Sequence, residues 1–311
     1  AYEIITCDWS SDVCPSDLEI AITDKYTRAI HAVKAGADAV IELPTVFATA
    51  NAEIFAKGAI KLINYCGGEK ILCFGTESGE KNKLLSTAAA LSEESKEFKK
   101  LVKEELKSGV PAIKAKCNAL ERMNIENLDF DLLKSPNNIL GIEYTKAVLQ
   151  SKANIDIFPI IRQGAAYNDV TLYEENSSAS AIRQAITEGK LKKIKSCVPS
   201  FVYDDLPDSL PDADDLIFYA AIKASRDELG RVLDCTEGLE NRIKALTRDC
   251  GSLECLINKI KTKRYTRTRL QRILLANMLG INERFIRRCL SSELYLKVLA
   301  VNKNRPEVLS A

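Results

Sequence analysis

The chain has 311 residues, of which 46% are hydrophobic and 28% are charged, and its formal net charge is +1. This length is enough for two domains with hydrophobic cores, and the composition excludes an intrinsically disordered chain. The near-zero net charge excludes a globally basic nucleic-acid binder but leaves room for a local basic patch. No apolar run is long enough to span a bilayer and no leader-like segment opens the sequence, so we expect a cytoplasmic protein that binds neither membrane nor DNA.

The sequence contains ten cysteines, and none of the eight after residue 18 forms a Cys-x-x-Cys pair. They are scattered through apolar or helical stretches, so we expect buried, reduced thiols and no metal site. These eight are Cys66, Cys73, Cys117, Cys197, Cys235, Cys250, Cys255 and Cys289.

Residues 8–18 have neither a helical nor a strand period, and they resemble the conceptual translation of a sequencing-library adapter. We therefore expect residues 1–18 to be an artefact outside the fold; the alternative is a native arm rich in Ser and Asp.

From Glu19 onward, helical patterns alternate with short apolar runs. The runs at 38–44, 70–74 and 155–161 are apolar enough to be strands buried on both faces, and helical segments separate them. Strands that alternate with helices predict a parallel sheet.

Polar residues accompany the ends of all three predicted strands. Glu42 lies at the end of the first, Gly75-Thr76-Glu77 follows the second, and Arg162-Gln163-Gly164 follows the third. Because ligands of doubly wound sheets bind beyond the carboxyl ends of the strands, we expect these residues to face one crevice.

A helix is predicted to begin at Ser178-Ala179-Ser180-Ala181-Ile182-Arg183 and to end at Gly189. Small hydroxyl residues leave the N-terminal N–H groups of a helix uncovered, and Arg183 adds a positive fork one turn later. The segment would suit a polyphosphate. The alternative is an ordinary Ser N-cap followed by a solvated arginine.

Beyond a linker-like stretch near residue 205, helix follows helix, and we expect helices at about 214–225, 238–248, 252–262, 267–279 and 282–290. The segment Lys259–Arg272 holds seven basic residues and no acid, with Tyr265 among them. It could contact phosphates and stack on a base, and the alternative is a solvated helix face. We place a domain boundary near 205.

Six segments, in order, resemble the bacterial tRNA(Met) cytidine acetate ligases. They are Asp38–Pro44, Phe74–Gly79, Pro136–Gly141, Arg162 with Tyr167–Asp169, Ser178–Arg183, and Lys261–Thr266 through Arg269–Arg272. The resemblance runs from about Glu19 to the end of the chain.

The resemblance implies an α/β fold with a Rossmann-like parallel sheet over residues 19–204, followed by an all-helical tRNA-binding domain over residues 205–311. It implies that ATP, with Mg2+, and acetate form acetyl-adenylate, whose acetyl group passes to N4 of the wobble cytidine of elongator tRNA(Met). The implied ATP contacts are Gly75, Asn137, Asn138, Arg162, Ser178, Ser180 and Arg183. Which asparagine contacts ATP stays open. The implied tRNA contacts are Lys261, Lys263, Arg264, Tyr265, Arg267, Arg269 and Arg272.

The chain departs from the family at its start. The family opens with a strand and a histidine loop of the Asn-Pro-Phe-His-x-Gly-His type, whereas the one histidine here, His31, lies within a predicted helix. We therefore expect the first strand to be missing, the C-terminus to be shortened, His31 not to be catalytic, and this polypeptide to be inactive. Two other functions stay open: adenylation of another small acid or cofactor precursor, and RNA binding without catalysis.

Overall fold

The structure is a computed structural model, and the chain divides into two compact units. The described residues are 4–6, 20–92, 96–108, 112–123, 130–133, 135–161 and 177–310. Unit 1 contains residues 1–49, 163–260 and 267–311, and unit 2 contains residues 50–162 and 261–266. A boundary near residue 205 is not part of this division and stays a prediction.

Unit 1 contains a small sheet and a series of helices. Its strands are β1 (Ile4–Thr6), β2 (Ala39–Ile41) and β5 (Val298–Val301). Its helices are α1 (Lys25–Lys34), α2 (Thr45–Ala48), α8 (Ala179–Thr187), α9 (Leu191–Ile194), α10 (Ser200–Tyr203), α11 (Asp214–Lys223), α12 (Arg226–Gly230), α13 (Leu239–Leu246), α14 (Leu253–Ile260), α15 (Arg267–Met278) and α16 (Glu283–Ser291). Two short 3-10 turns lie at Thr247–Asp249 and Pro306–Ser310.

The sheet of unit 1 corrects two expectations. β1 pairs with β2 in parallel, so the expectations that residues 1–18 lie outside the fold and that no strand precedes Glu19 are wrong at Ile4–Thr6, a β-branched run. β5 pairs with β2 in the antiparallel direction, so residues 205–311 are not all helical. α1 covers this sheet through a cluster of Ala29, Ala32, Ala37 and Val40.

The helices after residue 213 bury one apolar side each. The residues that are at most 1% exposed include Leu229, Leu239, Ile243, Leu256, Ile257, Ile260, Leu270, Ile273 and Leu274. The helical periods predicted from the sequence are confirmed here, whereas α12 was not predicted. The short α12 is closed by a capping box in which Ser225 and Glu228 exchange hydrogen bonds.

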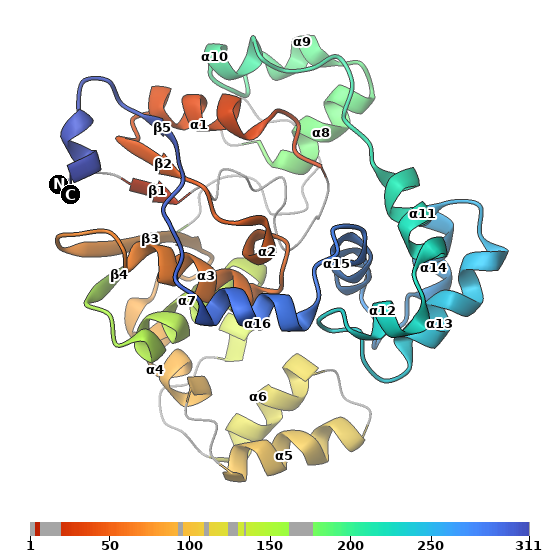
Figure 1. Ribbon diagram of the computed structural model, residues 1–311. Coiled ribbons are helices and arrows are strands. Elements are labelled where there is room, and N and C mark those ends of the chain that lie inside the picture. Colours follow the sequence, from red (N-terminus) through yellow and green to blue (C-terminus); the bar gives the residue numbers. More distant parts are fainter. Residues whose placement is uncertain are drawn as a thin grey trace. The chain divides into compact units, whose positions relative to one another are not determined.

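Unit 2 contains a two-stranded parallel sheet with helices on one of its faces. The strands are β3 (Lys70–Thr76) and β4 (Ile155–Ile161), paired in register from Lys70 with Ile155 to Thr76 with Ile161. The helices are α3 (Ala52–Ile63), α4 (Lys81–Ser92), α5 (Lys96–Lys107), α6 (Ala112–Arg122) and α7 (Pro136–Ser151), with a 3-10 turn at Phe130–Leu133. α7 packs against α3, α4 and β3 (Figure 1).

The two faces of this sheet differ in exposure. Leu72, Thr76 and Ile157 are buried on the helix-covered face, whereas Ile71 and Phe158 are 69% and 59% exposed on the other. Both strands were predicted to be buried on both faces, so that expectation is wrong for the outer face.

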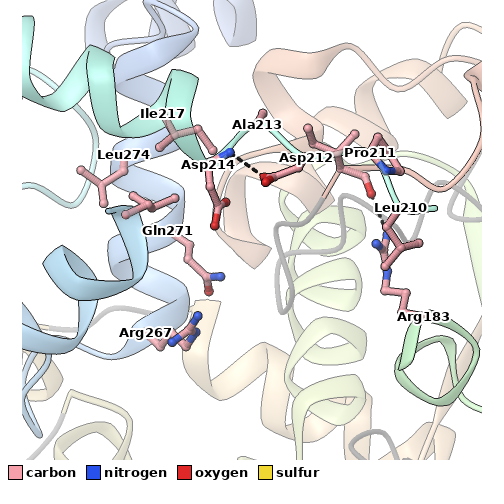
Figure 2. A pocket seen from close by; sticks show the side chains of 12 residues that line it. Arg183, Leu210, Pro211, Asp212, Ala213, Asp214, Ile217, Arg267, Gln271 and Leu274 are labelled. Atoms are coloured by element: carbon pink, nitrogen blue, oxygen red, sulfur yellow. Dashed lines mark hydrogen bonds between the residues drawn. The ribbon is translucent and has the colours of Figure 1, made fainter. Parts of the chain in front are cut away.

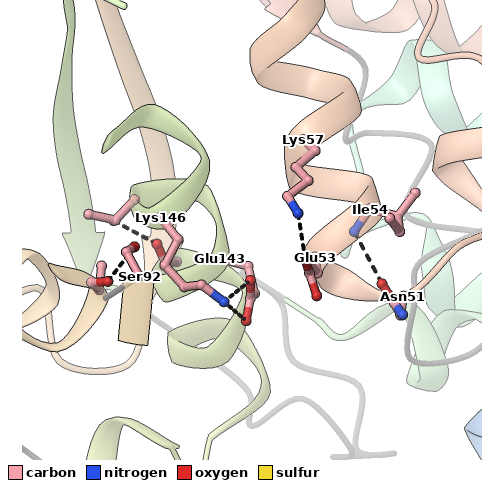
Figure 3. A network of polar contacts seen from close by, with 10 residues as sticks. Asn51, Glu53, Ile54, Lys57, Ser92, Glu143 and Lys146 are labelled. Carbon is pink, nitrogen blue, oxygen red and sulfur yellow. Dashed lines mark hydrogen bonds and ion pairs between the residues drawn. The ribbon is translucent and has the colours of Figure 1, made fainter. Parts of the chain in front are cut away.

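Ion pairs lie along two helices of unit 2. Lys57 pairs with Glu53 on α3, and Lys146 pairs with Glu143 on α7 at 2.8 Å (Figure 3). The second pair is largely buried, with side chains 10% and 15% exposed. Because each charge has its partner one helical turn away, α7 carries both charges inside the unit at a tolerable desolvation cost.

None of the described helices combines the length and the apolar character needed to cross a membrane.

Candidate nucleotide and RNA site

The turn after β3 brings together several of the residues predicted from the sequence. Gly75 is exposed near the carboxyl end of the strand. Thr76 is fully buried, and its Oγ1 accepts a hydrogen bond from the Gly79 N–H at 2.8 Å. Gly79 has a φ of +66°, which is the left-handed conformation that glycine adopts most readily. The turn is therefore tight and leaves the backbone around Gly75 accessible.

Glu77 ties this turn to the start of α7. Its carboxylate accepts hydrogen bonds from the Asn138 N–H at 2.8 Å, the Asn137 N–H at 3.3 Å and the Asn137 side-chain amide at 2.8 Å. In return, Asn138 Oδ1 accepts from the N–H groups of Glu77 at 2.9 Å and Ser78 at 3.3 Å. A carboxylate at a helix N-terminus is favoured by the uncovered N–H groups there. We name these contacts among Glu77, Ser78, Asn137 and Asn138 the β3–α7 clamp.

The β3–α7 clamp distinguishes the two asparagines that the sequence left open. Asn138 is 4% exposed and its side-chain oxygen is directed into the turn. Asn137 is half-buried at the surface of the same helix end. Asn137 is therefore the member of the pair that a ligand could reach.

α7 lies close to β3 because residue 141 is a glycine. A Cβ atom at Gly141 would lie 2.8 Å from Phe74 Cε2 and 3.2 Å from Thr76 Cγ2. This close packing fixes where the N-terminus of α7 and its two asparagines stand relative to the strand end.

Two other residues at predicted strand ends have different outcomes. Arg162 lies outside the described residues. Glu42 binds Lys25 and Lys297 at 2.9 Å each, and burial, which by itself would raise its pKa, is outweighed by these two ammonium groups, so the pKa of Glu42 is lowered. Glu42 is thus the centre of an ion-pair cluster in unit 1.

The predicted phosphate segment does form the start of a helix. Ser178 is the N-cap of α8, and its Oγ accepts from the Ala181 N–H at 3.0 Å. Ser180 lies half-buried in the first turn. Arg183 is 7% exposed, and its Nη2 donates to the Ile20 carbonyl at 2.8 Å. The Ser N-cap alternative is therefore present, but the arginine is buried and not solvated.

Arg183 also borders a pocket of ≈ 290 Å³ within unit 1. In Figure 2, Arg183 stands on one side, and Asp214, Gln271 and Arg267 stand on the other. Burial, followed by repulsion from Asp212 and Glu254, raises the pKa of Asp214. Since two arginines and two aspartates line this pocket, it has no strong preference for an anion.

The basic segment separates into two groups. Lys261, Lys263 and Arg264 are exposed. Tyr265 is only 8% exposed, so its ring is not open to stack on a base in this conformation, contrary to our expectation.

The arginines of α15 are bound to neighbouring helices and loops. Arg267 pairs with Glu254 of α14. Arg269 donates two hydrogen bonds to the Asp234 carbonyl, at 3.1 and 2.6 Å, and Arg272 lies 4.0 Å from the Asp234 carboxylate. Burial lowers the pKa of Arg272, and Asp234 acts in the opposite direction. The positive charge of this segment is therefore partly neutralised inside unit 1.

His31 lies in α1, within the helix that the sequence predicted. It is 4% exposed, its Nε2 lies 2.7 Å from Asp205 Oδ2, and its ring rests against Phe201 at a centroid distance of 5.7 Å.

Most thiols in the described part of the chain are not buried, contrary to our expectation. Cys235 is buried, and burial raises its pKa to about 12. Cys73 is exposed because it lies on the outer face of β3.

The sequence did not identify Asp234 and Glu254 as partners of the basic segment, and it placed Glu77 at a strand end without indicating what Glu77 binds. Glu77 follows a predicted strand within a Thr-Glu-Ser-Gly turn, which was a usable signal, but its partners are 60 and 61 positions away.

The described residues do not form a protein-held metal site. Among them, no three His, Cys, Asp or Glu side chains are grouped so that they could hold a metal ion, whereas Mg2+ requires several oxygen ligands in octahedral geometry. No chemical step is therefore assigned to a protein-bound metal.

Comparison with known proteins gives the family. A family model described as HIGH Nucleotidyl Transferase matches residues 19–311. The tRNA(Met) cytidine acetate ligase of Clostridium perfringens is 38% identical over 301 residues, which cover 93% of this chain and 75% of that protein. The tRNA(Met) cytidine acetate ligase of Caldicellulosiruptor saccharolyticus is 39% identical over 305 residues, covering 94% and 74%.

Solved structures point to the same family as these sequence matches. The apo crystal structure of Thermotoga maritima TmcAL has a TM-score of 0.87 and 29% identity, covering 93% of this chain and 72% of that chain. The structure of the same protein bound with alpha-thio ATP has a TM-score of 0.83 at 29% identity, covering 93% and 71%. The chain therefore belongs to the HIGH nucleotidyl transferase family and, within it, to the tRNA(Met) cytidine acetate ligases, a family of ATP-dependent enzymes.

Proposed function

We propose that the protein containing these residues joins acetate to the wobble cytidine of elongator tRNA(Met) at the expense of ATP. An acetate oxygen attacks the α-phosphorus of ATP, pyrophosphate leaves, and acetyl-adenylate forms. The N4 amine of the cytidine then attacks the acetyl carbonyl, loses a proton, and AMP leaves. The observation that carries the proposal is the likeness, over 93% of the chain, to a relative crystallised with alpha-thio ATP.

Adenylation of a carboxylate depends mainly on alignment and on stabilising the charge of the departing pyrophosphate. We propose Gly75 and Asn137 as contacts of the nucleotide, since both are accessible beside the carboxyl end of β3. Asn138 holds the turn and acts on ATP only through it. Arg162, Ser178, Ser180 and Arg183 remain the proposed phosphate contacts, with Mg2+ entering on the ATP phosphates.

We propose that tRNA contacts the exposed Lys261, Lys263 and Arg264, whereas Arg267, Arg269 and Arg272 hold α15 against its neighbours. Phosphate contacts by lysine and arginine supply affinity that falls as salt rises. Replacing Lys263 and Arg264 by alanine should therefore weaken tRNA binding and reduce its salt dependence. If both stay unchanged, this segment does not contact RNA.

The histidines that stabilise phosphates in this family have no counterpart in the described structure, where His31 is buried and bound to Asp205. We therefore expect the 311-residue polypeptide to catalyse little acetate-dependent exchange between ATP and pyrophosphate. The matched protein for comparison is a chimera in which the opening segment of the Clostridium perfringens relative replaces residues 1–18. This chimera should catalyse the exchange.

The choice of acid tests the reaction itself. In the assay with the matched protein, the rate of ATP–pyrophosphate exchange should be higher with acetate than with propionate, glycine or phosphorylated cofactor precursors at equal concentration. Exchange that depends on one of those acids and not on acetate would replace this proposal by adenylation of that acid.

A further inference from the structure

The outer face of α16 carries an unusual concentration of positive charge. Arg284, Arg287 and Arg288 are exposed within nine residues, in a chain whose net charge is only +1. At 100° per residue these three and Phe285 span about 160° of the helix circumference, so they share one side. The sequence analysis did not predict a function for this side of α16.

The opposite side of α16 is used for packing. Ile286 is 3% exposed, and the Glu283 N–H donates to the Arg231 carbonyl at 2.9 Å. The helix is therefore seated in unit 1 by its apolar residue and its N-terminus. Its arginines are directed outward by this seating.

The exposed side combines two kinds of contact. Arg287 pairs with Glu283, whereas Arg284 and Arg288 have no ion-pair partner in the part of the chain that the structure describes. Phe285 is 45% exposed beside them, so part of its ring is open to solvent. Guanidinium groups match phosphates geometrically, and an exposed aromatic ring can stack on an unpaired base.

A hollow of ≈ 560 Å³ lies beside the N-terminal end of α16. Lys223, Arg231 and the helix N-cap Asn282 line it, together with Glu228, whose carboxylate is bound by Ser225 at 2.7 Å. Its size lies in the range of small-ligand sites. Cationic and amide groups at its wall could receive a nucleotide that is turned out of a loop.

We propose that the outer side of α16, with the hollow at its N-terminus, is a second RNA-contact surface that binds single-stranded tRNA. The arginines bind phosphates, and Phe285 stacks on an unpaired base. The inference rests on the proposed function, because tRNA is its substrate there. An amphipathic membrane helix is disfavoured, since the apolar side of α16 faces the protein core.

The test is equilibrium binding of an unmodified elongator tRNA(Met) transcript over a range of KCl concentrations. The variant R284A/R287A/R288A should reduce the slope of log Kd against log salt by about 2, because each single-strand phosphate contact contributes about 0.7. Its affinity near 0.1 M salt should fall tenfold or more. The variant F285A should bind roughly tenfold more weakly with an unchanged slope, since stacking is not ionic.

The matched control is K99A/K100A/K103A, which removes the same charge from the exposed side of α5. It should leave the slope unchanged, and thermal melts should show that all variants fold. The inference is overturned if both triple variants lose slope equally, if neither does, if the wild-type chain binds no RNA, or if the α16 variant instead loses binding to anionic vesicles. The proposed function fails separately, if wild-type protein binds an unrelated tRNA as well as tRNA(Met) while the α16 effect persists.

Discussion

The β3–α7 clamp predicts opposite consequences for two adjacent asparagines. In Asn138→Ala, the N–H groups of Glu77 and Ser78 lose the acceptor that lies 2.9 and 3.3 Å away, inside a site where Asn138 is only 4% exposed. Leaving such donors without a partner costs about 1–3 kcal/mol, and we expect the free energy of unfolding to fall by that amount. Asn137→Ala removes a more accessible amide whose bond to Glu77 water can replace, so we expect a loss of about 0.5 kcal/mol or less.

For the affinity for ATP, we expect the opposite ranking of the two substitutions. Because Asn137 is the proposed ATP contact, Asn137→Ala should weaken binding of alpha-thio ATP about tenfold, as expected for one lost hydrogen bond to a charged ligand. Urea denaturation measures the first effect and calorimetric titration the second. The roles given to the two asparagines are wrong if Asn138→Ala unfolds at the wild-type urea concentration, or if Asn137→Ala destabilises the chain and Asn138→Ala does not.

Three further variants test other parts of the structure. Gly141→Ala should lower the free energy of unfolding by about 1–3 kcal/mol, because its Cβ would overlap Phe74; urea denaturation at or above wild-type stability would contradict the packing. Glu42→Gln should destabilise the protein by about 1–2 kcal/mol at pH 7. Because the lowered pKa of Glu42 means that the folded state favours the ionised carboxylate, this difference in stability should fade as pH falls through and below 4.5. A difference in melting that does not depend on pH would exclude the ion pairs as its cause. Ser178→Ala should cost about 1 kcal/mol through loss of the cap, whereas Ser178→Asp should keep stability but repel ATP; equal ATP affinity in Ser178→Asp would remove this helix end from the nucleotide site.

The sequence was most informative where a structural signal is local. The apolar runs at 70–74 and 155–161 identified β3 and β4, and Ser178 with Gly189 marked both ends of the helix that became α8. Local signals also existed for β1, whose Ile-Ile-Thr run is typical of a strand, but the atypical composition of residues 8–18 led us to disregard it.

Contacts between distant residues could not be predicted. The β3–α7 clamp joins positions about 60 residues apart, and no spacing rule connects them. The basic segment illustrates the same limit, because seven basic residues without an acid between Lys259 and Arg272 predict a solvated or RNA-bound surface. Three of them instead find Asp234 and Glu254 on other parts of unit 1, and the exposure of the remainder follows only from the fold.

The reaction proposed for this fold is acetylation of tRNA. Mass spectrometry of elongator tRNA(Met), after incubation with ATP and acetate, detects its product. It compares the 311-residue polypeptide with the protein carrying the opening segment of the Clostridium perfringens relative. We expect N4-acetylcytidine at the wobble position with the second protein and at most a trace with the first. Absence of the modified base with both, while both fold and bind ATP, would contradict the assigned reaction, and efficient acetylation by the first would contradict the need for the histidine loop.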